Sequence, residues 1–203
     1  MIAIIDYGVG NLFSLTCSFR SIGADICVTS DPEVIAAERI VLPGVGAFED
    51  AARKLRESGL DKVIKDECAK GKALLGICLG MQMLFEKSYE YGEHEGLGLI
   101  KGSIRPIADV IGEGLKIPHI GWNALHFGDK KDELFKYRDE GDCVYFVHSY
   151  YGAECDESVI ATAEYGAELT AAVRSGNVCG VQFHPEKSER VGLSILRAFC
   201  EIN

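Results

Sequence analysis

The most constraining feature of this sequence lies between residues 72 and 82, where an apolar run leads directly into a glycine-flanked cysteine. The run from 73 to 75 predicts a short buried strand, and the residues from 81 to 85 place apolar side chains at helical spacing. Gly76-Ile77-Cys78-Leu79-Gly80 stands between them. This succession of strand, Gly-x-Cys-x-Gly and helix is the layout of a nucleophile elbow, with a cysteine in place of the more common serine.

The residue types around Cys78 suit a reactive thiol. Glycine on both sides lets the backbone turn sharply and lets neighbouring segments approach without a Cβ clash. A thiol at the start of a helix is also favoured in its thiolate form by the helix dipole. Most cysteines, however, are small buried apolar residues. A catalytic role therefore requires a base elsewhere in the chain and a group that orients this base.

Composition limits the classes of protein to consider. The 203 residues predict one globular domain over 1–203. A net charge of −10 argues against a nucleic-acid partner, and no apolar run approaches the length of about 20 residues that a membrane helix needs. The N-terminus resembles a first strand and not a signal peptide. The 8 cysteines include no Cys-x-x-Cys pair, which favours reduced thiols in a cytoplasmic protein. Compact metal-binding spacings are lacking, so neither a metal nor another cofactor is expected.

The order of predicted elements indicates an α/β fold. Apolar runs predict strands at 2–5, 26–28, 39–42, 73–75, 103–105, 143–150, 159–163, 171–174 and 178–183. Amphipathic patterns predict helices at 12–22, 48–57, 61–70, 81–85 and 193–200. The early alternation of strand and helix favours a mostly parallel central sheet with helices on both faces. Ligands of such sheets bind at the carboxyl ends of the strands. The later strands, separated by turns, predict an antiparallel extension.

Pro43-Gly44-Val45-Gly46 follows the third predicted strand and has two interpretations. One is a tight turn between a strand and a helix. The other is a nest of backbone N–H groups that binds an oxyanion. Spacing alone leaves both open. His119 and His126 are isolated histidines, and such residues are more often satisfied in a loop or core than used as ligands.

His184-Pro185-Glu186 provides the missing base. Proline disfavours a helical conformation for the residue before it, and residues i and i+2 of an extended chain point the same way. Glu186 is therefore expected to accept a hydrogen bond from His184 Nδ1 and to hold Nε2 toward a nucleophile. Cys78 and His184 both follow predicted strands of one sheet. We expect them at the same sheet edge, as a catalytic pair.

With these residues in place, the chain resembles the class I (triad) glutamine amidotransferases, through the segments 76–82 and 181–186. Four further segments resemble the glutaminase subunits of imidazole glycerol phosphate synthase: 6–14, 42–48, 118–123 and 147–150. The resemblance covers nearly the whole chain. It implies a flavodoxin-like fold and hydrolysis of glutamine in histidine biosynthesis, with no cofactor. It also implies a heterodimer with a (β/α)8-barrel cyclase that receives the ammonia.

The resemblance also implies roles for individual residues. Cys78 is the expected nucleophile, His184 the acid and base, and Glu186 the residue that orients His184. The residues expected to bind glutamine and the oxyanion are Val45, Gly46, Leu79, Gln82, His148, Ser149 and Tyr150. Asn11 and Lys187 are expected at the partner interface.

Three other functions remain open at this point. The first is a glutaminase of another class I complex, for pyridoxal phosphate, purine, anthranilate or guanine synthesis, which Gly121-Trp122-Asn123 disfavours. The second is a Cys-His hydrolase that works alone, such as an esterase. The third is a non-catalytic binding module on the same fold, which the intact set of three catalytic residue types disfavours.

Overall fold

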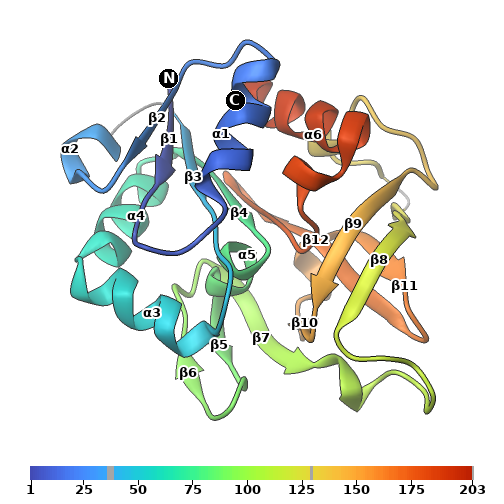
Figure 1. Cartoon of the computed structure of the whole chain (residues 1–203). Coiled ribbons are helices and arrows are strands. Elements are labelled where there is room, and N and C mark those ends of the chain that lie inside the picture. The colour runs from blue at the N-terminus through green and yellow to red at the C-terminus, as the bar shows by residue number, and fades with distance from the viewer. Residues whose placement is uncertain (36–38, 129, 203) are drawn as a thin grey trace.

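A seven-stranded sheet forms the centre of the molecule, seen here in a computed structural model that describes residues 1–35, 39–128 and 130–202. Its strand order is β11-β12-β13-β4-β3-β1-β2 (Figure 1). These strands are β1 (Ile2–Ile5), β2 (Ile26–Thr29), β3 (Arg39–Leu42), β4 (Ala73–Ile77), β11 (Val159–Glu164), β12 (Glu168–Ser175) and β13 (Val178–Val181). The five strands from β13 to β2 run parallel, whereas β12 is antiparallel to both of its neighbours, β13 and β11. This confirms the predicted mostly parallel sheet with an antiparallel extension.

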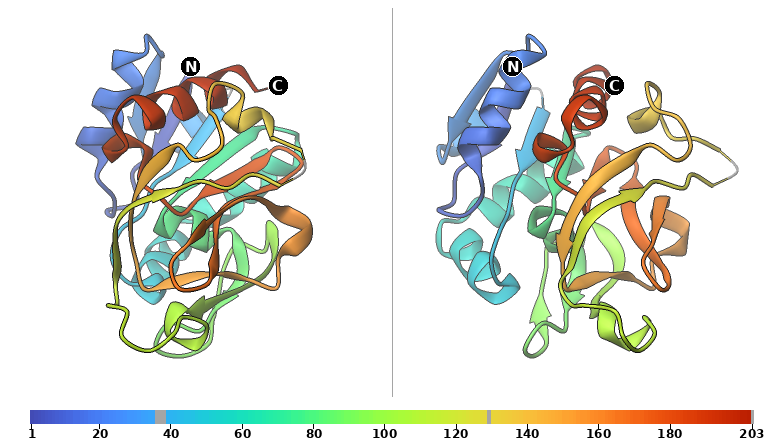
Figure 2. Two further views of the ribbon diagram at one scale, coloured as in Figure 1. Left: turned by 90° about the vertical axis from the view of Figure 1, so that its right-hand side faces the viewer. Right: turned by 45° about the vertical axis from the view of Figure 1, so that its right-hand side comes forward.

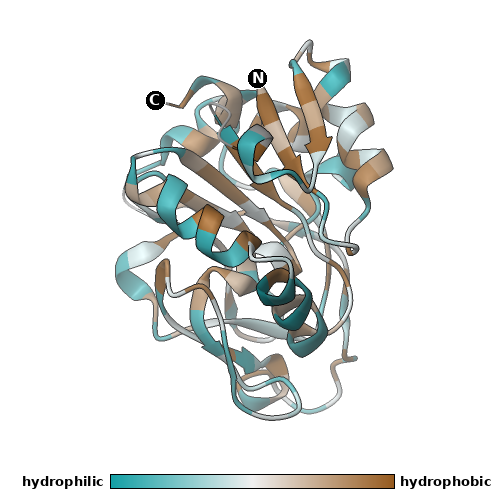
Figure 3. Ribbon diagram, turned by 90° about the vertical axis from the view of Figure 1, so that its left-hand side faces the viewer, coloured by the Kyte–Doolittle hydropathy of each residue, from teal (hydrophilic) through white to brown (hydrophobic). Residues whose placement is uncertain are grey.

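Helices cover both faces of the sheet, as the sequence predicts. One face packs against α1 (Leu12–Ser21) and α6 (Glu189–Glu201), and the other packs against α2 (Pro32–Ile35), α3 (Phe48–Glu57) and α4 (Leu60–Ala69) (Figures 1 and 2). Figure 3 shows apolar strands between helices whose outer surfaces are largely hydrophilic.

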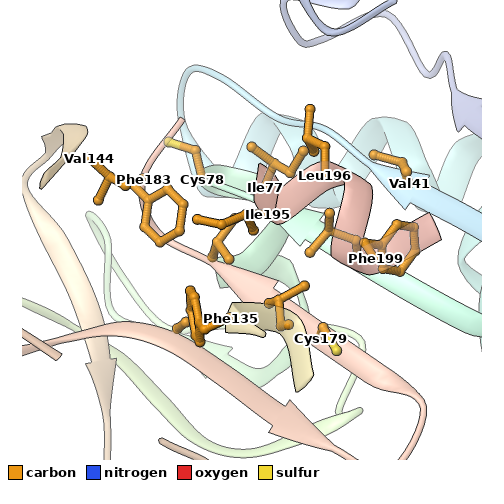
Figure 4. Close-up of a cluster of buried hydrophobic side chains, with 14 of the residues drawn as sticks. Val41, Ile77, Cys78, Phe135, Val144, Cys179, Phe183, Ile195, Leu196 and Phe199 are labelled. Carbon is orange, nitrogen blue, oxygen red and sulfur yellow. The ribbon is translucent and has the colours of Figure 1, made fainter. Parts of the chain in front are cut away.

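The strands pack on both faces because successive side chains of a strand point to opposite sides. In β3, Val41 joins the cluster under α1 and α6, whereas Ile40 and Leu42 join the one under α3 and α4. Figure 4 shows Cys78 between Phe183 and Ile77, at one end of the α6-side cluster. The nucleophile candidate therefore sits on a packed core.

No helix within the described ranges is both long and apolar enough to cross a membrane.

Two smaller sheets lie beside the main sheet, and the sequence did not predict them as separate units. One has the order β10-β7-β5-β6, and the other is a ribbon of β8 and β9 (Figure 2). Their strands are β5 (Phe85–Ser88), β6 (His94–Glu95), β7 (Ile100–Pro106), β8 (His119–Ala124), β9 (Cys143–His148) and β10 (Tyr150–Ala153). The predicted single strand over 143–150 is wrong. The chain leaves the β8–β9 ribbon at Ser149 and joins β7 as β10.

The helix after Cys78 begins and ends two residues earlier than the predicted 81–85. It is α5 (Leu79–Met83), and Phe85 already belongs to β5, which pairs with β7. Phe85 is fully buried, and an apolar residue can be buried equally in a helix or a strand, so its hydrophobic character does not distinguish the two. Phe85 is a strand residue because it pairs with Ile100 of β7.

Candidate active site

Cys78 is the first residue after β4 and has a strained backbone. Its φ angle is 54°, in the left-handed region, and its N–H donates a 2.8 Å hydrogen bond to the Val181 carbonyl. Such a conformation costs a non-glycine residue on the order of 1–3 kcal/mol and is often found at functional sites. The flanking glycines fit the close approach expected from the sequence. A Cβ on Gly76 would lie 2.7 Å from the Gly80 carbonyl oxygen, and one on Gly80 would overlap the Leu42 carbonyl oxygen.

His184 reaches the same sheet edge because β13 is the parallel neighbour of β4, with Val181 opposite Ile77. The chain runs on for two residues to His184, whose N–H donates a 2.9 Å hydrogen bond to the Tyr145 carbonyl of β9. The hydroxyl of Ser188 donates to the His184 carbonyl at 2.7 Å and accepts from the Tyr145 N–H at 2.9 Å. Ser188 is fully buried, and sequence reasoning missed it.

The predicted contact between His184 and Glu186 is present, but the predicted backbone is wrong. His184 Nδ1 lies 2.8 Å from Glu186 Oε1, with the two side chains 3% and 4% exposed. Pro185–Lys187 forms a turn of 3₁₀ helix instead of an extended segment. His184 itself is extended, as the following proline requires. The 3₁₀ turn brings the Glu186 carboxylate back to the His184 imidazole.

The environment of His184 favours its charged form. Burial lowers the pKa of His184, but hydrogen bonds to Cys78 and Glu186 and their negative charges outweigh burial and raise the pKa to about 9. An imidazolium between a thiol and a carboxylate stabilises the thiolate, which is the nucleophilic form of cysteine. The arrangement is that of a cysteine nucleophile, a histidine acid or base, and a carboxylate that fixes the ring.

A cavity of about 310 Å³ opens beside Cys78 and His184. All seven residues predicted to bind glutamine and the oxyanion line it: Val45, Gly46, Leu79, Gln82, His148, Ser149 and Tyr150. Sequence reasoning missed four further lining residues, Glu90, Tyr91, Pro118 and Val147. Glu90 also accepts a 2.6 Å hydrogen bond from the Phe48 N–H at the start of α3, and burial raises the pKa of its carboxyl group. A glutamate and two tyrosines therefore line the space next to the thiol.

Two polar side chains at the cavity wall are held by the Tyr150 carbonyl. It accepts hydrogen bonds from His148 Nδ1 at 2.8 Å and from Gln82 Nε2 at 3.3 Å. Burial lowers the pKa of His148 to about 4, so its ring is neutral at neutral pH. With the proton on Nδ1, its Nε2 faces His119 Nδ1 at 3.0 Å. His119 is thus a buried partner of His148, in line with the expectation that it sits satisfied in the core.

The Pro43–Gly46 segment lies directly against the elbow. A Cβ on Gly44 would come 2.7 Å from the Gly80 nitrogen, and the Tyr7 hydroxyl donates a 2.8 Å hydrogen bond to the Pro43 carbonyl. Gly46 has a φ of 96°, which glycine adopts readily. The segment therefore serves as the tight turn into α3, and its backbone also lines the cavity. The turn interpretation and the oxyanion interpretation are compatible with each other.

The two predicted interface residues lie outside the cavity lining. Asn11 caps α1, where its Oδ1 accepts from the Ser14 N–H at 3.4 Å, as its position before the helix predicts. The Lys187 ammonium lies 5.7 Å from the centre of the Tyr145 ring. His126 lies elsewhere, with Nδ1 2.9 Å from Glu140. In the part of the chain that the structure describes, no cluster of three or more histidine, cysteine or carboxylate side chains is placed to hold a metal ion.

Comparisons with known proteins place the chain in a family. The model of the family described as "Glutamine amidotransferase class-I" matches residues 3–202. The imidazole glycerol phosphate synthase subunit HisH of Wolinella succinogenes is 46% identical, over 100% of both chains. The subunit of the same name from Aquifex aeolicus is 48% identical, over 97% of this chain and 94% of its own.

Solved structures share the fold at lower identity. A crystal structure of a glutamine amidotransferase superimposes with a TM-score of 0.76 at 20% identity, over 99% of this chain and 98% of that one. A chain of PurLQS from Thermotoga maritima gives 0.73, also at 20%, over 98% and 97%. Together with the full-length relatives, the family match shows that the chain belongs to the class I glutamine amidotransferases, among the subunits named HisH of imidazole glycerol phosphate synthase.

Proposed function

We propose that this chain hydrolyses glutamine to glutamate and ammonia with Cys78, His184 and Glu186, as the glutaminase subunit of imidazole glycerol phosphate synthase in histidine biosynthesis. The observation that carries the proposal is the Cys78–His184–Glu186 arrangement at a cavity of about 310 Å³. Membership of the family and the names of the full-length relatives support the same activity.

The chemistry proceeds in two halves. The Cys78 thiolate attacks the side-chain amide carbon of glutamine, and His184 gives its proton to the nitrogen as the C–N bond breaks and ammonia leaves. A γ-glutamyl thioester remains. His184, now neutral, takes a proton from water, and the resulting hydroxide displaces the thiolate to release glutamate. Glu186 keeps the imidazole oriented through both halves.

The remaining predicted residues bind the substrate and its charge. Backbone N–H groups of Val45 and Leu79 stabilise the oxyanion of each tetrahedral intermediate. Gly46, Gln82 and the segment from His148 to Tyr150 hold glutamine in the cavity they line.

The ammonia goes to a partner, a (β/α)8-barrel cyclase that forms a heterodimer with this chain in the cytoplasm. Ammonia released into water takes up a proton and loses its nucleophilic lone pair, so transfer requires a closed interface. Ile117, Ile120 and Trp122 support such an interface because they are 45%, 57% and 48% exposed next to the cavity residue Pro118. Asn11 and Lys187 take part in the same contact.

Replacement of the thiol tests this function. In the reconstituted complex, Cys78→Ala should abolish glutamine-dependent product formation but leave formation from added ammonium salts intact, because the cyclase is unchanged. Cys143→Ala, at an exposed cysteine outside the cavity lining, is the matched control and should behave as wild type. Glutamine turnover by Cys78→Ala would refute the nucleophile assignment. Turnover of esters with no activity on glutamine would indicate a hydrolase that works alone.

A further inference from the structure

Gln182 is a fully buried polar residue that the proposed chemistry leaves without a role. It stands between β13 and His184, two residues before the proposed base. Its side-chain amide bridges two residues of the site. The oxygen Oε1 accepts a 2.9 Å hydrogen bond from Gln82 Nε2, and the nitrogen Nε2 donates to Cys78 Sγ at 3.8 Å.

The direction of these hydrogen bonds is fixed by a backbone group. The Tyr150 carbonyl can only accept, so the Gln82 group facing it at 3.3 Å must be the NH₂. The same NH₂ faces Gln182, so Gln182 must present its oxygen there. The opposite end of the Gln182 amide is then an NH₂ group directed at the sulfur. A flip of either amide would place two acceptors or two donors against each other inside the protein, which is costly.

A donor next to the sulfur has a different effect on each protonation state of Cys78. Hydrogen bonds to an ionised acceptor are stronger than those to a neutral one, so an N–H group favours the thiolate over the thiol. Because Gln182 is fully buried and its oxygen is anchored to Gln82, its NH₂ is held in place before any substrate binds.

We infer that Gln182 is a positioning residue that holds Cys78 Sγ at the cavity and favours its thiolate through the Nε2–H donor. The inference deepens the proposed function, since it rests on Cys78 as the nucleophile. Gln182 does not touch the reacting carbon. It acts on Cys78 through its NH₂ group. Its oxygen also holds the Gln82 amide in its orientation.

Other ionisable groups also face Cys78, and the experiment must hold them constant. His184 follows β13 and bonds to Cys78, and the buried Tyr7 hydroxyl after β1 interacts with it electrostatically. His148, at the end of β9, and Glu90, after β5, line the same cavity. None of these four residues is changed in the variants below, so a difference between variants reports on the residue at position 182.

The test is the pH dependence of Cys78 alkylation by iodoacetamide in the full-length chain, because only the thiolate reacts. Exposed cysteines also react, so the Cys78 peptide is followed by mass spectrometry. In Gln182→Met the midpoint of the alkylation profile should move up by about one pH unit, the order of shift expected from the loss of one hydrogen bond to a charged group. In Gln182→Glu, which preserves size, a carboxylate faces the sulfur and the midpoint should move further up.

A structural control separates this effect from loss of packing. Thr170, on the neighbouring strand β12, is also buried, and its hydroxyl donates a 2.8 Å hydrogen bond to the Gly152 carbonyl. Thr170→Val should lower the melting temperature without moving the Cys78 profile. Unchanged midpoints in both Gln182→Met and Gln182→Glu, with the variants folded by circular dichroism, would overturn the inference. Alkylation requires no glutamine turnover, so that result would leave the proposed function standing.

Discussion

Gly192 offers a test of the site through a residue that never meets the substrate. It lies on α6, where the helix packs against the turn that carries His184 and Glu186. A Cβ at this position would stand 2.6 Å from the Pro185 carbonyl carbon and 2.9 Å from its Cα, and would overlap the carbonyl oxygen. Carbon atoms pack at about 3.5–4.0 Å, so Gly192→Ala requires the turn to retreat by about 1 Å.

Stability and activity should respond to this change by different amounts. Overpacking costs about 1–3 kcal/mol, but alanine in place of glycine within a helix returns up to about 1 kcal/mol. The net loss of folding free energy is therefore about 0–3 kcal/mol. A displacement of about 1 Å in catalytic groups, in contrast, can lower the rate by about 10²-fold. Gly192→Ala should accordingly remain folded and lose about 10²-fold in kcat.

The assay is glutamine hydrolysis by the reconstituted complex, paired with a urea titration of the free chain. Gly112→Ala is the matched control, because a Cβ there meets nothing within 4 Å and its φ is not in the left-handed region. Gly112→Ala should alter neither kcat nor the free energy of unfolding. If Gly192→Ala retains kcat within two-fold of wild type, the contact between α6 and the turn does not position His184, and the reasoning fails.

Three further predictions concern the same turn. As pH rises through about 9, His184 loses the proton that leaving ammonia requires, so kcat/KM for glutamine should fall. Because the folded-state pKa exceeds the ordinary value of 6.5, the protonated ring stabilises the fold fully below pH 6.5. This contribution is lost toward pH 9, so urea midpoints should drop more between pH 7 and 10 in wild type than in His184→Asn. Ser188→Ala leaves the partly buried Tyr145 N–H without its acceptor, which should cost about 1–3 kcal/mol in urea unfolding and lower kcat; unchanged unfolding would contradict this role.

The three residues of the proposed catalytic arrangement could be singled out from the sequence because each carries a local signal. Cys78 stands between two glycines after an apolar run, and His184 and Glu186 flank a proline after another. Parallel strands of one sheet end at the same edge, so the two signals could be combined without coordinates. The predicted contact between His184 and Glu186 was correct, although the predicted extended backbone after His184 was not. A 3₁₀ turn and an extended chain both bring these two side chains together.

The features that were missed depend on partners far along the chain. Gln182 follows β13 within an apolar run, and nothing local reveals that its amide meets Gln82 and Cys78. In the sequence Ser188 resembles an ordinary helix cap. Only the fold brings the Tyr145 N–H to its hydroxyl. The break at Ser149 divides a run that is rich in strand-forming residues, and the separate partners β8 and β7 explain it. Local propensity cannot supply such information.

The place of β13 in the sheet has a consequence for the protein during its synthesis. β13 is the last strand in the sequence, yet it lies between β12 and β4 and not at an edge. A nascent or prematurely terminated chain that stops before Val178 contains Cys78 but lacks His184, the proposed base, and the strand that joins the two parts of the sheet is missing. We expect such a fragment not to hydrolyse glutamine, and its β4 presents an unpaired apolar edge that can associate with other chains. The proposed hydrolysis of glutamine therefore requires synthesis to continue through β13 to Glu186, and a chain interrupted before Val178 exposes the edge of β4 instead.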